Sequence, residues 1–310
     1  MPPATVFPLL CPVCRDALRF GGGDARTLVC GAGHSFDAAK QGYFNFLVGK
    51  GTVFEADSAD MVAARFDFLS AGHYQPLADA IAGLAAPALM EAPGRRGLVL
   101  DAGTGTGHYL RAVLDRVAPD LAVARDLSTD GVSANTALAE SVSAAAIGLD
   151  ISKFALRRAA RMNPEALNVV GDVWQPLPVA ENSVDVVTVV FAPRNAPEFA
   201  RVLRPGGRLV VVTPRPGHLA EVAGLTGMLG IEPAKDERLT ASLGQHFAPV
   251  ETQDLDLALT LSPRDVANLA YMGPAGHHLD RAALAALEAE LPVCTAVSAR
   301  FRISVLEPIP

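Results

Sequence analysis

The amino-acid sequence predicts a doubly wound α/β fold preceded by a small metal-binding module. Half of the 310 residues are hydrophobic and 19% are charged, which supplies enough apolar material for a buried core. Five short apolar runs between residues 97 and 213 alternate with helical patterns, as expected for a parallel sheet covered by helices on both faces. Three of the four cysteines fall within the first thirty residues, with a histidine close behind.

The N-terminal cysteines have the spacing of a metal site. Cys11, Cys14, Cys30 and His34 form the pattern C-x2-C-x15-C-x3-H, in which two close ligand pairs can meet at the corners of a tetrahedron. We expect Zn²⁺ there, and a structural role, because four protein ligands leave no open coordination position. The alternative is a cluster of reduced cysteines without metal. The remote Cys294 is expected to be a small buried hydrophobic residue.

Three segments are predicted: a zinc-binding ribbon over residues 1–50, a helical connector over 51–96 and the main domain over 97–310. Tyr43, Phe44 and Phe46 at the end of the ribbon either pack against it or form a stacking surface for unpaired bases, and packing is favoured. One connector helix should begin after a Ser58 cap and break at residues 71–72. A second helix should cover residues 76–90.

The main domain alternates apolar runs with helical patterns. Two helices are expected at residues 109–117 and 152–162, and a C-terminal tail should contain a strand from residue 255, a helix opened by Ser262-Pro263 and a last strand at 299–306. The five predicted parallel strands cover residues 97–101, 145–150, 167–172, 184–191 and 208–213. Three of these runs end on an aspartate, so acidic side chains should gather at one edge of the sheet.

The first of these strands ends in a glycine-rich loop, which reads Asp-Ala-Gly-Thr-Gly-Thr-Gly over residues 101–107. Glycines Gly103, Gly105 and Gly107 let the backbone approach a ligand closely. A dinucleotide would bring its pyrophosphate here, but Asp101 would repel that anion. The charge favours a cationic ligand, and S-adenosylmethionine carries both a sulfonium and an ammonium group.

Two further aspartates complete this predicted cofactor site. Asp150 is placed to accept from both ribose hydroxyls, and Asp172 to accept from the adenine amino group, with Val173 or Trp174 against the ring. The alternative role for these acids is to cap helices.

The end of the fourth run is the candidate site for the methyl acceptor. Phe191 could stack on a planar base, Pro193 gives a rigid turn, and Arg194 or Asn195 could reach a phosphate or a base edge. The structural alternative is a strand that a proline terminates, with a solvated arginine.

Charge is distributed unevenly along the chain. The net charge is −7, but residues 151–217 carry nine basic and five acidic residues, whereas residues 218–310 carry six and twelve. A locally basic surface can hold phosphates on an acidic protein, because charge beyond roughly 10 Å is screened. No apolar run reaches the roughly 18 residues of a spanning helix, and no secretory leader is evident, so a cytoplasmic location without membrane contact is expected.

Taken with the cysteine pattern and the Asp101 loop, three further motifs resemble those of the 23S rRNA (guanine-N1) methyltransferases, a family that includes the tylosin-resistance methyltransferases of actinomycetes. The motifs are Phe68–Leu77 (FLSAGHYQPL), Gly148–Lys153 (GLDISK) and Thr213–Leu219 (TPRPGHL). The resemblance implies a Rossmann-like S-adenosylmethionine methyltransferase sheet, a zinc ribbon that helps bind RNA, and cofactor contacts from Tyr74, Gly105, Thr106 and His218. Residues 119–143 depart from the family pattern and are interpreted as a surface insertion or an extra helix.

The predicted function is transfer of a methyl group from S-adenosylmethionine to N1 of a guanine in hairpin 35 of 23S rRNA. The Ala-, Gly- and Arg-rich composition favours the branch that confers resistance to tylosin-type macrolides. A small-molecule methyltransferase of antibiotic biosynthesis and a non-catalytic RNA-binding protein remain as alternatives, and a dehydrogenase is disfavoured. The expected partner is the 23S rRNA hairpin; a homodimer is a further expectation that the sequence does not decide.

Overall fold

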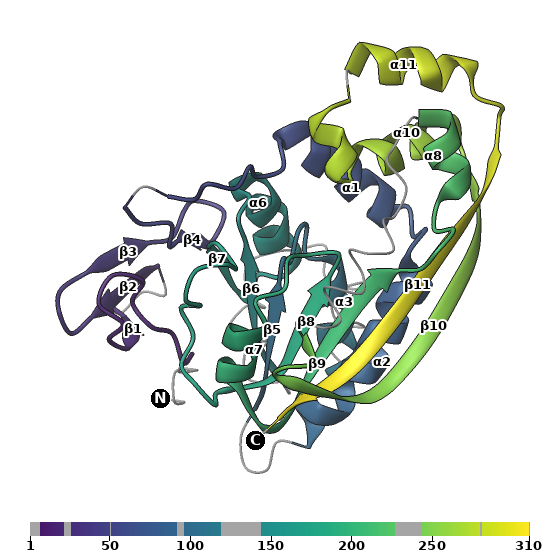
Figure 1. Cartoon of the computed structure of the whole chain (residues 1–310). Helices are drawn as coiled ribbons and strands as arrows, with labels where there is room; N and C mark the ends of the chain where they lie inside the picture. The colour runs from purple at the N-terminus through teal and green to yellow at the C-terminus, as the bar shows by residue number, and fades with distance from the viewer. Residues whose placement is uncertain are drawn as a thin grey trace.

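The elements of this computed structural model are arranged around one large sheet, with the N-terminal strands at one side and a long C-terminal hairpin at the other (Figure 1). The structure describes residues 7–21, 26–49, 51–91, 96–118, 144–226, 243–279 and 281–309. The predicted insertion at 119–143 lies outside these residues. The elements are β1 (Leu18–Phe20), β2 (Thr27–Cys30), β3 (Ser35–Asp37), β4 (Tyr43–Asn45), α1 (Ala59–Ser70), α2 (Gln75–Met90), β5 (Gly97–Ala102), α3 (His108–Val117), β6 (Ala144–Asp150), α6 (Lys153–Met162), β7 (Leu167–Val170), β8 (Val184–Val190), α7 (Ala196–Val202), β9 (Leu203–Pro214), α8 (Ala220–Thr226), β10 (Phe247–Leu261), α10 (Pro263–Tyr271), η1 (Pro274–His277), α11 (Arg281–Glu290) and β11 (Thr295–Pro308).

The large sheet has the strand order β10-β11-β9-β8-β5-β6-β7-β4. Strands β4 to β9 run parallel, and β11 and β10 continue the sheet in antiparallel pairing. All five predicted parallel strands are present. The chain leaves β5 toward β6 on one side and later returns to β8 on the other, so the carboxyl ends of β5 and β8 form the crevice where such sheets bind ligands.

Side chains of the central strands alternate between two apolar cores. Val99 of β5 packs with α2 and α3 on one face, whereas its neighbours Leu98 and Leu100 face the other core. That second core contains Phe199 of α7 and, from the N-terminal module, Leu9. The helices and the ribbon therefore bury both faces of the sheet, which accounts for the continuous apolar runs in the sequence.

The N-terminal module is a three-stranded antiparallel sheet of β1, β2 and β3. The next strand, β4, pairs in parallel with β7 at the edge of the large sheet. Tyr43, Phe44 and Phe46 are buried there. The packing interpretation is confirmed for Phe44 and Phe46, which share a core with Leu9 and Cys11 of the ribbon, whereas Tyr43 packs against α1 and α6.

Local capping explains where two helices begin. The Ser58 and Ser262 hydroxyls accept from the backbone N–H groups three residues ahead, at Met61 and Asp265, as the sequence predicted. The last strand is longer than predicted, because it begins at Thr295. The prediction for Cys294 was wrong: the side chain is exposed, since it lies in the short connection between α11 and β11. Over the part of the chain that is described, no helix has the length and apolarity to cross a membrane.

Candidate active site and metal centre

The four predicted metal ligands come together in the N-terminal ribbon. One ligand atom from each of Cys11, Cys14, Cys30 and His34 lies within 4.8 Å of all the others. The sulfurs of Cys14 and Cys30 are 3.6 Å apart, and Nδ1 of His34 lies 3.3 Å from the Cys30 sulfur. Thiolates bound at about 2.3 Å to a tetrahedral zinc would lie about 3.8 Å apart. The donor set and spacing therefore fit Zn²⁺ in a structural site.

Hydrogen bonds hold this metal centre against the loop that follows β7. The knuckle residue Arg15, at a φ of 67°, donates from Nη1 to the Pro176 carbonyl at 3.2 Å. Leu10 N–H donates to the Pro178 carbonyl at 3.0 Å, and Ala180 N–H donates back to the Pro8 carbonyl at 2.8 Å. The ribbon is thus fixed against the connection between β7 and β8.

The glycine loop has a left-handed backbone at its three glycines. Gly103, Gly105 and Gly107 have φ values of 85°, 55° and 88°. A β-carbon on Gly103 would collide with that of Ala192, and one on Gly107 would lie 2.6 Å from the Asn163 amide nitrogen. A β-carbon built on Gly105 would instead have no neighbouring atom within 3.4 Å. The loop is therefore packed at its two ends and open in its middle.

Asp101, at the end of β5, has a carboxylate oxygen with no internal partner. The residue is 2% exposed, and its Oδ1 accepts from the Thr188 hydroxyl at 2.7 Å. Its Oδ2 has no hydrogen-bond partner among the described residues. Burial raises the pKa of this carboxyl to about 6, against the opposing effects of the Thr188 and Thr104 hydroxyls. A buried carboxylate with a vacant acceptor fits the ammonium group of S-adenosylmethionine.

The other two strand-end aspartates are held by backbone N–H groups. Asp150 accepts from Gly105 and Ser152, each at 2.8 Å. Burial nevertheless raises its pKa. Asp172 accepts from Trp174 N–H at 2.9 Å and from the Thr52 hydroxyl at 2.7 Å. Asp150 thus links the glycine loop to α6, and Asp172 links the connector to the loop after β7.

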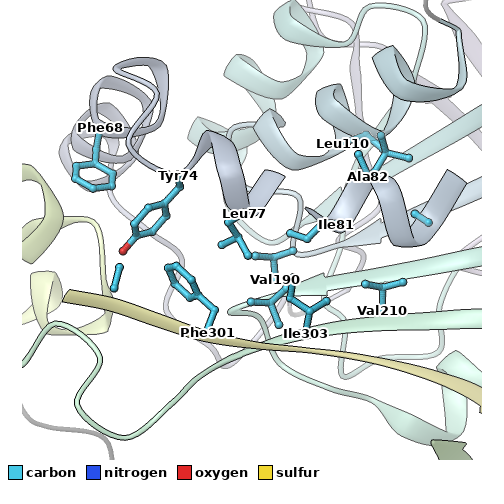
Figure 2. Packing of buried hydrophobic residues seen from close by; sticks show 14 of the residues in the cluster. Phe68, Tyr74, Leu77, Ile81, Ala82, Leu110, Val190, Val210, Phe301 and Ile303 are labelled. Atoms are coloured by element: carbon cyan, nitrogen blue, oxygen red, sulfur yellow. The ribbon is translucent and has the colours of Figure 1, made fainter. Parts of the chain in front are cut away.

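Tyr74 and His218 meet at the ring of Phe301. Figure 2 shows the Tyr74 ring between Phe68 and Phe301, whose centroids each lie 5.1 Å from it. The Tyr74 hydroxyl is buried without a hydrogen-bond partner within the described structure. His218 lies 4.9 Å from Phe301 and accepts from Arg300 N–H at 3.0 Å. Burial lowers the pKa of His218 to about 4, so the ring is neutral at pH 7.

The predicted acceptor residues form an exposed loop after β8. Phe191 has a φ of 53°, which is strained for an aromatic residue, and its side chain is 45% exposed. Its ring lies 5.7 Å from that of Phe301, which places it beside Tyr74 and His218. Pro193 is exposed, and the Asn195 amide donates to the Val173 carbonyl at 2.8 Å. The loops after β7 and β8 are therefore joined directly.

Arg65 of α1 is a site residue that the sequence analysis missed. Its side chain approaches Gly105, with Cδ and Nη1 each 3.8 Å from a β-carbon built there. It also pairs with Asp57 of the connector and donates to the Met272 carbonyl. Its positive charge lowers the pKa of Asp150, opposing the effect of burial. The sequence offered no signal for this role beyond a basic residue in a half-buried helix.

The basic residues of 151–217 do not form one open surface. Several pair with acids, as in the contacts Arg201–Glu198 at 2.7 Å, Arg204–Asp185 at 3.6 Å, Arg208–Glu307 at 3.2 Å and Arg215–Asp256 at 2.8 Å. Four of the nine basic residues in this segment thus pair with acids, and two of these pairs, Arg208–Glu307 and Arg215–Asp256, join the end of the parallel sheet to the acidic C-terminal hairpin.

The fold, the glycine loop and the strand-end carboxylates define an S-adenosylmethionine-dependent methyltransferase with a zinc ribbon. Residues 9–48 match the zinc-ribbon family described as RlmA, N-terminal, and residues 100–211 match a methyltransferase-domain family. The chain is 42% identical to a protein of Micromonospora griseorubida named provisionally as a 23S rRNA (guanine-N1)-methyltransferase, with 97% of both chains covered.

A second relative, the 23S rRNA (guanine(748)-N(1))-methyltransferase of Streptomyces fradiae, is 40% identical over 97% of both chains. A Bacillus subtilis protein that carries the guanine-N1 name provisionally is 29% identical over 68% of this chain and 66% of its own. The chain belongs to the 23S rRNA (guanine-N1)-methyltransferase family.

Proposed function

We propose that this enzyme methylates N1 of a guanine in hairpin 35 of 23S rRNA and thereby confers resistance to tylosin-type macrolides. The observation that carries the proposal is that the zinc ribbon is fixed against the same β7–β8 connection that holds Asp172 of the predicted cofactor site. A ribbon in this place extends the site toward a large substrate. Guanine 748, the position in the name of the Streptomyces fradiae relative, is the first to test.

The chain's own residues account for cofactor binding in this proposal. Asp101 holds the ammonium group through its vacant oxygen, Asp150 the ribose hydroxyls and Asp172 the adenine amino group. Gly105 and Thr106, at the centre of the glycine loop, adjoin the cofactor in this proposal, and Tyr74 and His218 contact it from the Phe301 side. Bound S-adenosylmethionine supplies an electrophilic methyl group.

The target base has to leave its helix, because N1 lies on the pairing edge of guanine. In the proposal the strained Phe191 stacks on the extruded base, while Pro193 and Asn195 fix the loop that orients it. Positioning of this kind can supply much of the rate acceleration. The N1 proton has to leave as the carbon–nitrogen bond forms, and in this proposal it passes to water, because His218, with a pKa of about 4, is a poor acceptor for it.

Incubation with S-adenosylmethionine labelled in the methyl group and a transcript of the hairpin tests the reaction. We expect one labelled N1-methylguanine and a matching stop in reverse transcription, both lost when that guanine is changed to adenine. Label that persists on the changed transcript, or turnover of a small molecule without RNA, would refute the proposal.

Resistance is tested by expressing the protein and an Asp101→Asn variant in a tylosin-sensitive bacterium. The homodimer and the cytoplasmic location remain predictions. Light scattering, which measures the molar mass in solution, would test the homodimer.

A further inference from the structure

Two aromatic side chains are paired on the surface at the carboxyl edge of the sheet. Phe54 of the connector and Trp174 of the loop after β7 have ring centroids 6.4 Å apart and ring planes inclined by 35°. They are 49% and 45% exposed, and the adjacent Val53 is 94% exposed. Large apolar side chains grouped in this way on a surface indicate a binding site.

Hydrogen bonds to Asp172 fix the two chain segments that carry these rings. The Thr52 hydroxyl donates to Asp172 Oδ2 at 2.7 Å, and the Thr52 oxygen accepts from Phe54 N–H at 3.1 Å. The other Asp172 oxygen accepts from Trp174 N–H at 2.9 Å. Both aromatic residues are therefore anchored to one buried carboxylate, although 120 residues separate them along the chain. These hydrogen bonds keep both rings at the surface.

The aromatic pair lies between the metal centre and the acceptor loop. The Val173 carbonyl, next to Trp174, accepts from Asn195 of the acceptor loop at 2.8 Å. The Pro176 carbonyl, two residues beyond Trp174, accepts from the guanidinium of Arg15 in the zinc knuckle at 3.2 Å. A ligand that contacted both the ribbon and the acceptor loop would therefore pass over the aromatic pair. The positive charge of Arg15 would lie beside that ligand.

We propose that Phe54 and Trp174 form a stacking site for an unpaired RNA base that neighbours the target guanine. The inference rests on the proposed function and names a second contact of the same substrate. Extruding the target guanine takes away the stacking partner of the adjacent base. Aromatic side chains replace such stacking with little dependence on base identity, while Arg15 attracts the backbone phosphate.

Fluorescence can report this contact, because Trp174 is the single tryptophan of the chain. The zinc-loaded protein is titrated with the hairpin transcript in the presence of S-adenosylhomocysteine, and separately with S-adenosylhomocysteine alone. We expect saturable quenching by RNA and little change with the nucleoside alone. Equal quenching by the nucleoside would assign the ring to the cofactor's adenine, and unchanged emission from RNA-saturated protein would overturn the inference.

Kinetics of variants provide the second test. For Trp174→Ala and Phe54→Ala we expect the KM for the hairpin to rise roughly 5- to 100-fold. We expect Trp174→Phe to restore most of the affinity and kcat to stay within about twofold of wild type. A Kd for the cofactor that rises in parallel with the KM would assign the Trp174 ring to the adenine and refute the stacking site. Met90→Ala is the matched control, since Met90 is 67% exposed at the end of α2, just before β5 begins at the opposite edge of the sheet.

The outcomes separate the two proposals. If the wild type methylates the hairpin but Trp174→Ala keeps its KM, the stacking site is wrong and the proposed function stands. If the wild type methylates no ribosomal hairpin, the proposed function fails, and filter-binding Kd values for the same variants still decide the stacking site. A KM for the hairpin that rises equally in Met90→Ala would also refute the stacking site, and so would a fall in kcat with no change in KM. Thermal melting of each variant shows whether it is folded.

Discussion

Replacing Asp101 with asparagine should stabilise the ligand-free protein while weakening its affinity for the cofactor. The pKa of Asp101 is raised from 3.8 to about 6 by burial. One pKa unit corresponds to about 1.4 kcal/mol, so the ionised carboxylate costs about 3 kcal/mol at neutral pH. Asparagine can still accept from Thr188, but its amide nitrogen takes the place of the unpartnered oxygen and costs about 1–2 kcal/mol. The net gain should be about 1–2 kcal/mol.

The sign of the effect depends on pH. A raised acid pKa means that the folded state holds the proton more tightly than the unfolded state. The wild-type penalty is therefore full above about pH 6 and falls to nothing as the pH drops toward 4. Asp101→Asn should therefore be more stable than wild type at pH 7 and less stable by about 1–2 kcal/mol at pH 4, where only the cost of the amide nitrogen remains.

Urea unfolding of both proteins at several pH values measures the stability, and calorimetric titration measures the Kd for S-adenosylmethionine. Loss of a charged hydrogen-bond partner should raise that Kd roughly 10- to 100-fold. Asp185→Asn is the matched control, because Asp185 is also buried but accepts from Leu98 N–H at 2.7 Å. This control should be destabilised. An Asp101→Asn protein that is less stable than wild type at pH 7, or that keeps its cofactor affinity, would refute the reasoning.

Three further predictions concern the ribbon, the glycine loop and α1. Cys30→Ser, or zinc removal by a chelator, should abolish RNA methylation yet leave the cofactor Kd within about threefold, measured by calorimetry. Gly103→Ala should lower the free energy of unfolding by about 1–3 kcal/mol in urea, whereas Gly83→Ala, with open space around it, should raise it by up to about 1 kcal/mol. Arg65→Ala should raise the Kd for the cofactor about tenfold, and Arg65→Lys should raise it less, because a cation beside Gly105 suits the cofactor carboxylate. A Kd for Arg65→Ala equal to that of wild type would contradict this.

Local patterns predicted those parts of the site that depend on neighbours in sequence. The spacing of Cys11, Cys14, Cys30 and His34 was sufficient because zinc geometry constrains short loops. The sequence analysis identified the glycines at 103–107 by their lack of a β-carbon, and the positive φ values found there suit such residues. The Ser58 cap was equally local.

Contacts between distant segments were not predictable from one sequence. Arg65 has no motif of its own, and its place beside Gly105 follows from how α1 crosses the loop. A basic surface was expected over residues 151–217, but strand pairing brings Arg208 of β9 to Glu307 of β11, and Arg215, just after β9, to Asp256 of β10. Cys294 was expected in a core, and its position just before β11 leaves it exposed.

The sequence by itself determined the fold class, the metal ligands and the acidic carboxyl edge of the sheet, because hydrophobic period, ligand spacing and backbone sterics act over a few residues. Tertiary structure alone decided where the connector lies, and with it the bond from Thr52 to Asp172 that pairs Phe54 with Trp174. Pairing of segments 120 residues apart depends on the packing of the whole sheet, which no local pattern records.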